Sequence, residues 1–135
     1  KKRIGLIFMS FSYIVDTSAW IEYFSATDKG LKIKQLIEQE EIATSITALL
    51  EIADKFEREN RRFYICLRFV QKRAVILPLT IELALAAAKL KKKQREKREK
   101  FSISDGAHLA TAIEEGAVLL TADNDFAGLE NVRLL

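Results

Sequence analysis

Four acidic residues at the ends of short apolar segments are the side chains of this 135-residue sequence best suited to chemistry. They are Asp16, Glu51, Asp105 and Asp123, and they are spread so widely along the chain that only a fold can gather them. Carboxylates held close together raise one another's pKa unless a cation lies among them. Because all the candidate ligand atoms are oxygens, the sequence predicts a Mg²⁺ or Mn²⁺ site rather than a zinc site.

The sequence offers little for other catalytic chemistries. It holds one cysteine, Cys66, and one histidine, His108, so a cysteine nucleophile would have only that histidine as its base. We find no usable Ser-His-Asp set and no glycine-rich phosphate loop. The chemistry best supplied is water activated by carboxylate-held metal ions, which also neutralise charge on a phosphodiester. We interpret Cys66 as a core residue and His108 as a residue for helix packing or partner contact.

Each acid also has a purely structural interpretation. Asp16 could cap the helix that follows it, and Glu51 could pair with Lys55 on a solvated helix face. Asp105 could be a first-turn acid favoured by the helix dipole, and Asp123 could be a turn residue. Each signal alone is weak, and their joint placement favours a common site.

Apolar periodicity predicts short strands alternating with pairs of helices. The expected strands are residues 13–15, 42–44, 74–77, 117–120 and 132–134. The expected helices with simple bounds are residues 19–24, 29–39 and 62–72. A further helix is expected from a cap at Ser45 or Thr47 to about residue 60, and a long helix after Thr80 that could reach Lys100. The last expected helix is 105–115, capped by Ser104 and ended by Gly116. This order predicts an α/β fold, a three-layer α/β/α sandwich with a central, mostly parallel sheet.

The predicted topology gathers the four acids. In open α/β sheets, sites form at the carboxyl ends of the strands. Asp16 and Asp123 follow strands, whereas Glu51 and Asp105 lie near the starts of helices. We expect a single domain over residues 1–135, with residues 1–8 as a candidate N-terminal extension before Met9.

Composition fits one cytoplasmic domain. The sequence is 49% hydrophobic and 30% charged, so it can bury a core and remain well solvated. No apolar run approaches the roughly 18 residues of a membrane span, and we expect no membrane partner. A single cysteine permits no intrachain disulfide, which is typical of a reducing cytoplasm.

The net charge of +3 is unevenly distributed. Residues 89–100 hold eight basic and two acidic residues, so the remainder of the chain is mildly acidic. One interpretation is a solvated helix face on which Glu96 and Glu99 pair with neighbouring lysines. The other is an RNA-binding arm, because lysine and arginine that neutralise phosphates dominate nucleic-acid affinity. Its candidate contacts are Lys91, Lys92, Lys93 and Arg95.

Four segments of the sequence together resemble the PIN domain family and, within it, the VapC-type toxins. The first is Ile14-Val15-Asp16-Thr17-Ser18-Ala19, and the second is Glu51 after Thr44-Ser45-Ile46-Thr47. The third is Ser104-Asp105-Gly106-Ala107-His108-Leu109-Ala110-Thr111-Ala112, and the most specific is Leu120-Thr121-Ala122-Asp123-Asn124-Asp125-Phe126. The resemblance covers nearly the whole chain from Tyr13. The basic stretch is longer and more charged than we expect in a compact toxin of this family.

The resemblance implies a Mg²⁺- or Mn²⁺-dependent endoribonuclease acting on single-stranded or structured RNA, a homodimer, and a small antitoxin protein as partner. It implies that the ligands are Asp16, Glu51, Asp105 and Asp123, with Asp125 as an auxiliary acid. Thr17 and Thr121, and less strongly Ser18, are expected to orient the carboxylates through their hydroxyls.

Two alternatives to the toxin remain open at this point. One is a housekeeping RNA-processing nuclease of the same fold, and the other is a non-catalytic RNA- or protein-binding module whose acids are structural. A phosphoacceptor receiver domain fits poorly, because Leu77-Pro78-Leu79 stands where it would need an acid after the third strand.

Overall fold

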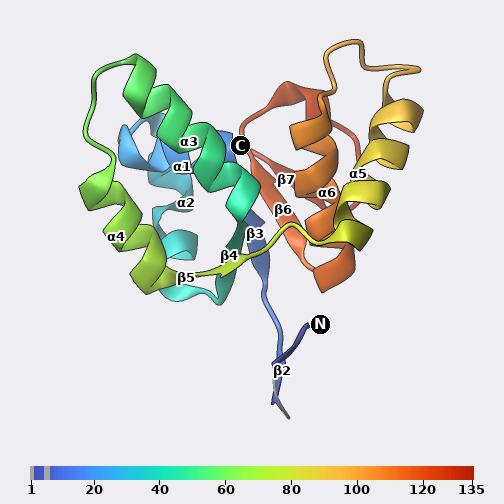
Figure 1. The fold of residues 1–135 in the computed structure, drawn as a ribbon. Coiled ribbons are helices and arrows are strands. Elements are labelled where there is room, and N and C mark those ends of the chain that lie inside the picture. The colour runs from blue at the N-terminus through green and yellow to red at the C-terminus, as the bar shows by residue number, and fades with distance from the viewer. Residues whose placement is uncertain (1, 5–6) are drawn as a thin grey trace.

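The structure, a computed structural model, describes residues 2–4 and 7–135 (Figure 1). The strands are β1 (Lys2–Ile4), β2 (Ile7–Met9), β3 (Tyr13–Val15), β4 (Ile42–Ser45), β5 (Ala74–Leu77), β6 (Val118–Thr121) and β7 (Val132–Leu134). The helices are α1 (Thr17–Phe24), α2 (Asp28–Gln39), α3 (Ile46–Arg58), α4 (Tyr64–Arg73), α5 (Ile81–Gln94), α6 (Ile103–Glu115) and the short 3₁₀ turn η1 (Asn124–Phe126). This order confirms the predicted alternation of strands and helix pairs.

A five-stranded sheet in the order β5-β4-β3-β6-β7 forms the central layer, and all its neighbouring strands are parallel. Helices α1 to α4 cover one face and α5 with α6 cover the other (Figure 1). Strand residues alternate between the two cores: Ile14 and Leu119 face α5 and α6, whereas Val15 and Leu120 face the other helices. The predicted three-layer α/β/α architecture is confirmed.

Helix α6 begins two residues earlier than predicted. Its N-cap is Ser102, not Ser104, and Ser102 forms a capping box with Asp105. In this box the Ser102 hydroxyl accepts from the Asp105 N–H, and the Asp105 carboxylate accepts from the Ser102 N–H. Gly116 ends the helix in the left-handed conformation (φ 61°), as predicted.

Helices α5 and α6 approach each other closely at Gly106. A Cβ at that position would lie 2.4 Å from the carbonyl oxygen of Ala87 on α5. Only glycine permits this approach, which sets α6, and with it Asp105, against α5.

Helix α5 ends at Gln94, so the prediction of a helix reaching Lys100 is wrong. The chain turns because the wholly buried Phe101 must reach Phe126, with which its ring makes an edge contact. Arg95 secures the turn by donating from Nε to the carbonyl of Phe101. Like charges four residues apart, at Lys89, Lys93 and Lys97, further disfavour helix there. Residues 95–102 are therefore a connector rather than a continuation of α5.

Strands β1 and β2 pair with each other, antiparallel, and not with the central sheet. The predicted N-terminal extension at residues 1–8 includes residues 1, 5 and 6, which lie outside the described residues. Among the helices that the structure describes, none combines the length and the apolar character needed to cross a membrane.

Candidate metal and active site

All four predicted acids line one pocket of about 190 Å³ at the carboxyl edge of the sheet. Asp16 follows β3 and Asp123 follows β6, while Glu51 comes from α3 and Asp105 from the first turn of α6. The complete lining is Asp16, Thr17, Ser18, Ile21, Glu51, Asp105, His108 and Asp123. Segments more than 100 residues apart in sequence thus converge, as expected for strand ends and helix starts at one edge.

Asp16 is buried, with 2% of its surface exposed, and it also caps α1. Its Oδ1 accepts from the backbone N–H of Ala19 at 3.0 Å and from the hydroxyl of Ser18 at 2.8 Å. Burial raises the pKa of Asp16 above its usual value, although His108 and these hydrogen bonds oppose the rise. The structural and the functional interpretations of Asp16 are therefore compatible, because one carboxylate oxygen caps the helix and the residue still lines the pocket.

Glu51 is held by two side chains and does not pair with Lys55. The hydroxyl of Thr17 donates to Oε1 at 2.6 Å, and Nε2 of His108 lies 2.9 Å from the same oxygen. Lys55 pairs instead with Glu59. Burial alone would raise the pKa of Glu51, but its hydrogen bonds to His108 and Thr17 and the charge of His108 outweigh that effect and lower it. Glu51 is thus an oriented carboxylate.

His108 lines the pocket, whereas the sequence interpretation favoured helix packing or partner contact over a role as ligand. It is 2% exposed, its Nε2 bonds Glu51, and its Nδ1 has no hydrogen-bond partner among the described residues. Burial lowers the pKa of His108, but the hydrogen bond to Glu51 and the charges of Asp16, Glu51 and Asp105 raise it more. Its position three residues after Asp105, on the same face of α6, was visible in the sequence, but the hydrogen bond to Glu51 on α3 was not.

Asp105, Asp123 and Asp125 form the tightest carboxylate group. Each offers an oxygen, and these oxygens all lie within 4.8 Å of one another. Burial and the nearby charge of Asp123 both raise the pKa of Asp105, which hydrogen bonds from Ser102 partly offset. Such mutual repulsion is what a bound cation relieves. Asp16 and Glu51 line the pocket with Asp105 and Asp123 but do not belong to this group, whereas Asp125 belongs to the group and does not line the pocket.

Hydroxyls near the acids fix the loops that carry them. Ser18 links two strand ends, because its hydroxyl donates to Asp16 and accepts from the Ala122 N–H at 2.9 Å. The hydroxyl of Thr121 accepts from the Asp123 N–H at 3.0 Å, and Asp123 Oδ1 accepts from the Asp125 N–H at 2.9 Å. Ser18 therefore has more contacts at the site than its sequence alone indicated.

The donor set fits a hard divalent cation. Asp105, Asp123 and Asp125 offer only oxygen atoms, which Mg²⁺ and Mn²⁺ prefer as ligands. The imidazole of His108, which also lines the pocket, uses its Nε2 to bond Glu51. The ordered hydrogen bonds to Asp105 and Asp123 hold their carboxylates in place in advance.

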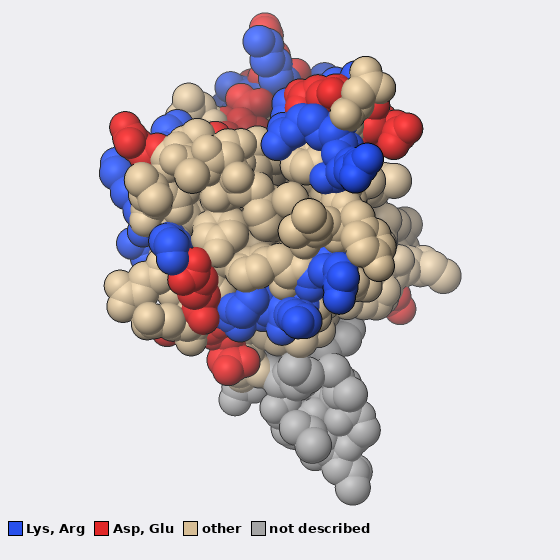
Figure 2. Space-filling model, turned by 90° about the vertical axis from the view of Figure 1, so that its left-hand side faces the viewer, with Lys and Arg blue, Asp and Glu red and all other residues tan. Residues whose placement is uncertain are grey.

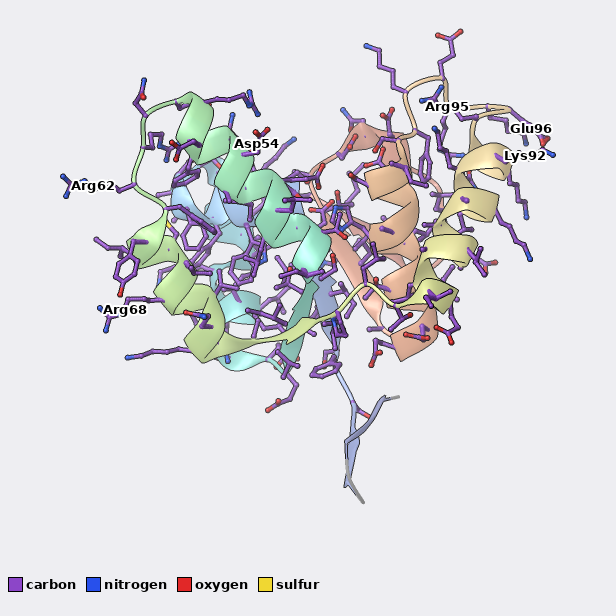
Figure 3. All side chains as sticks on the ribbon, viewed as in Figure 1. Asp54, Arg62, Arg68, Lys92, Arg95 and Glu96 are labelled. Carbon is purple, nitrogen blue, oxygen red and sulfur yellow. The ribbon has the colours of Figure 1, made fainter. Side chains whose placement is uncertain are left out.

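The four basic residues predicted to bind RNA do not line the acidic pocket. Lys93 lines a separate pocket, and Arg95 is engaged with the Phe101 carbonyl. Figure 3 shows Lys92 at the outer side of α5, away from α6.

Comparisons with known proteins identify the family of this chain and structures that share its fold. The model of the PIN domain family matches residues 13–131. The comparison with curated proteins returned no match. Among solved structures, the chain is similar to one in a toxin–antitoxin complex from Klebsiella pneumoniae, with a TM-score of 0.71, 20% identity, and coverage of 90% of this chain and 96% of that one.

Two further structures are similar. One is VapBC2 from Rickettsia felis bound to a DNA fragment from their promoter, with a TM-score of 0.70, 19% identity, and coverage of 91% of this chain and 96% of that one. The other is DNA-bound VapBC from Salmonella typhimurium, with a TM-score of 0.71, 16% identity, and coverage of 93% and 97%. At these identities the likeness shows a shared fold.

Proposed function

This chain belongs to the PIN domain family, and from that premise we propose that it is a Mg²⁺- or Mn²⁺-dependent endoribonuclease. The observation that carries the proposal is the convergence of Asp16, Glu51, Asp105 and Asp123 on one pocket. A non-catalytic module has no need for this arrangement, because two of these acids carry raised pKa values that cost stability in the absence of a cation.

Asp105, Asp123 and Asp125 would hold the cation. When bound, it supplies an activated water and neutralises charge on the phosphodiester. Hydrogen bonds from other residues of the chain hold the carboxylates in position. The Ser102 N–H fixes Asp105, the Asp125 N–H fixes Asp123, and the hydroxyl of Ser18 fixes Asp16.

Glu51 would remain ionised in the working pocket. Its hydrogen bonds to Thr17 and His108 lower its pKa and hold Oε1 in a single orientation. An oriented anionic carboxylate in the pocket lining can bind a cation or accept a hydrogen bond from water. This gives Glu51 a defined role that its sequence position alone supported only weakly.

We propose further that the enzyme is the toxin of a VapBC-type toxin–antitoxin pair. The likeness in fold to chains of three toxin–antitoxin complexes supports this proposal. Exposed apolar side chains on α4 support it as well. Figure 2 shows a broad uncharged area, rimmed by charged residues, on the side of the molecule where α4 lies. Tyr64 and Ile65 on α4 are 66% and 79% exposed, which is typical of a protein-binding surface.

We propose a homodimer through α5 and α6. These helices present the exposed Ile81, Leu85 and Ile113, and Ile113 also lines an apolar pocket of about 440 Å³ between the two helices. Leu85→Glu should convert a dimer to a monomer in light-scattering mass measurements, because it places a charge in an apolar contact. Ile65→Glu on α4 is the matched control and should remain dimeric. A dimer that survives Leu85→Glu would contradict this interface.

Cleavage of single-stranded RNA with and without Mn²⁺ tests the enzymatic proposal. Wild-type protein should cleave only with Mn²⁺ or Mg²⁺, and Asp105→Asn should lose most of the activity, because it removes a ligand. Asp54→Asn, an exposed acid on α3 paired with Arg58, is the matched control and should retain activity. Cleavage in chelator, or full activity of Asp105→Asn, would contradict the mechanism.

A further inference from the structure

The connector after α5 forms a second pocket beside the acidic one. It has a volume of about 460 Å³ and lies between the end of α5 and the residues that follow η1. Its lining is Lys93, Gln94, Glu96, Lys97, Arg98, Gly128 and Leu129. Three cations therefore face a single carboxylate, so the pocket carries net positive charge.

Arg98 joins this pocket to the loop that carries the acids. Its guanidinium donates to Oε1 of Gln94 and to the carbonyl of Ala127. Ala127 comes two residues after Asp125, and the lining residue Gly128 comes three residues after it. A chain of three residues spans at most about 10 Å. The basic pocket is therefore fixed, by Arg98 and by the short chain, next to the carboxylate group.

The cations of this pocket are not neutralised by the protein. Among the described residues, the ion pairs lie on α2, on and just after α3, and in the acidic pocket. None involves Glu96 or Glu99, so the interpretation of this segment as a helix face with its own salt bridges is not supported. Lys93 and Lys97 are exposed and take part in none of these ion pairs, so both ammonium groups are available to an anion from solution.

We propose that this pocket binds a backbone phosphate of an RNA strand that runs on from the acidic pocket, with Lys93 and Lys97 as its charged contacts. The proposal rests on the proposed ribonuclease function and names a substrate contact that lies outside its metal site. Arg98 acts as the positioning residue, since its hydrogen bonds hold α5 and the loop after η1 together. The end of α5 and the start of α6 lie on the same side of the molecule (Figure 1), so one RNA strand can run from the acidic pocket to the basic one.

The basic pocket includes only part of the predicted RNA-binding arm. Of the four predicted contacts, only Lys93 lines the pocket, whereas Lys97 and Arg98 were not among them. Lys91 and Lys92 lie in the same segment but do not line it. They therefore provide a control with the same change of charge at almost the same place.

The test compares the double variants Lys93→Gln/Lys97→Gln and Lys91→Gln/Lys92→Gln in binding single-stranded RNA. Binding is measured in chelator, where cleavage does not interfere, over a series of salt concentrations. Loss of one phosphate contact makes the slope of log K against log salt shallower by about 0.7. We expect this change in the pocket variant and a smaller one in the control. Thermal unfolding checks that both variants fold, since Lys92, Lys93 and Lys97 are exposed and Lys91 is half-buried.

A poly-glutamate peptide separates RNA from an acidic protein segment as the ligand. Removing two cations weakens the binding of any polyanion, but the pocket variant should lose more affinity for RNA than for the peptide. An equal effect of the two double variants on RNA, or an equal loss of RNA and peptide binding, would overturn the proposal. Because binding is read without metal, this outcome is independent of whether the protein cleaves RNA with Mn²⁺.

Discussion

Nε2 of His108 lies 2.9 Å from Oε1 of Glu51, across helices that come from opposite faces of the sheet. Helix α3 packs in one core and α6 in the other, and the two meet only beyond the carboxyl edge of the strands. This contact therefore ties the two layers together at the site.

Replacing His108 with Ala should lower RNA cleavage by about 10- to 100-fold, the usual cost of losing a partner that orients a ligand. The reason is that Glu51 would keep only the hydroxyl partners Thr17 and Ser104 and would lose the ring that fixes its orientation. His108→Gln, which can still donate to Glu51, should restore part of the activity. Single-turnover cleavage at saturating Mn²⁺ measures the effect. Equal activity of the wild type and the Ala variant would show that the contact has no catalytic consequence.

The Ser102 cap should matter for both stability and activity. Ser102→Ala removes the hydroxyl that caps α6 and should lower the free energy of unfolding by about 1 kcal/mol. It also loosens the box that holds Asp105, so cleavage should fall as well. Thr80→Ala removes the equivalent cap of α5 at a residue that does not line the acidic pocket, and it is the matched control. It should cost similar stability in urea unfolding and leave cleavage unchanged, and a parallel loss of activity in both variants would refute the role given to the box.

Gly106→Ala should destabilise the protein, because the added Cβ would lie 2.4 Å from the Ala87 carbonyl. Overpacking of this kind costs about 1–3 kcal/mol. Gly116→Ala is an informative comparison, since no atom would lie within 4 Å of its Cβ, and its cost comes from the left-handed φ alone. Urea denaturation measures both. If Gly106→Ala moved the helices apart without cost, the close packing of α5 and α6 would not be needed for stability.

Tyr23 should titrate late. Burial, together with the hydrogen bond from its hydroxyl to Glu38 and the charge of Glu38, raises its pKa from 10.0 to about 12. A folded-state pKa above the unfolded value favours the neutral phenol in the native protein. The resulting stability is fully present below pH 10 and is lost as pH rises from there through about 12.

Ultraviolet titration of the phenolate tests this directly. The difference between the wild type and Tyr23→Phe should have its midpoint near pH 12 in the folded protein. Glu38→Gln removes the charge and should bring the midpoint down. A midpoint at the ordinary value of 10.0 in the wild type would contradict the burial and hydrogen bonding seen here.

The order of elements was predictable because each strand carries its own local signal. The strand at Val132–Leu134 matches its predicted bounds, and Gly116 ends α6 as predicted. The end of α5 was not predictable from local pattern, since it depends on Phe101 finding Phe126 far along the chain. The cap at Ser102 could be predicted from the sequence, because Asp105 stands three residues after Ser102, as a capping box requires.

The site was predictable in outline and not in its internal grouping. Topology brings Asp16, Glu51, Asp105 and Asp123 to one pocket, as expected from strand ends. However, the closeness of Asp125 to Asp105 depends on the η1 turn, and the bond between His108 and Glu51 depends on how two helices pass each other. Such distances follow from three-dimensional packing, which a sequence pattern does not encode locally.

The most direct test of the central claim is anomalous diffraction from crystals of the protein soaked in Mn²⁺. We predict a peak among the carboxylates of Asp105, Asp123 and Asp125, and its disappearance in Asp123→Asn crystals soaked in the same way. A wild-type crystal with no anomalous peak in this pocket at saturating Mn²⁺ would contradict the account.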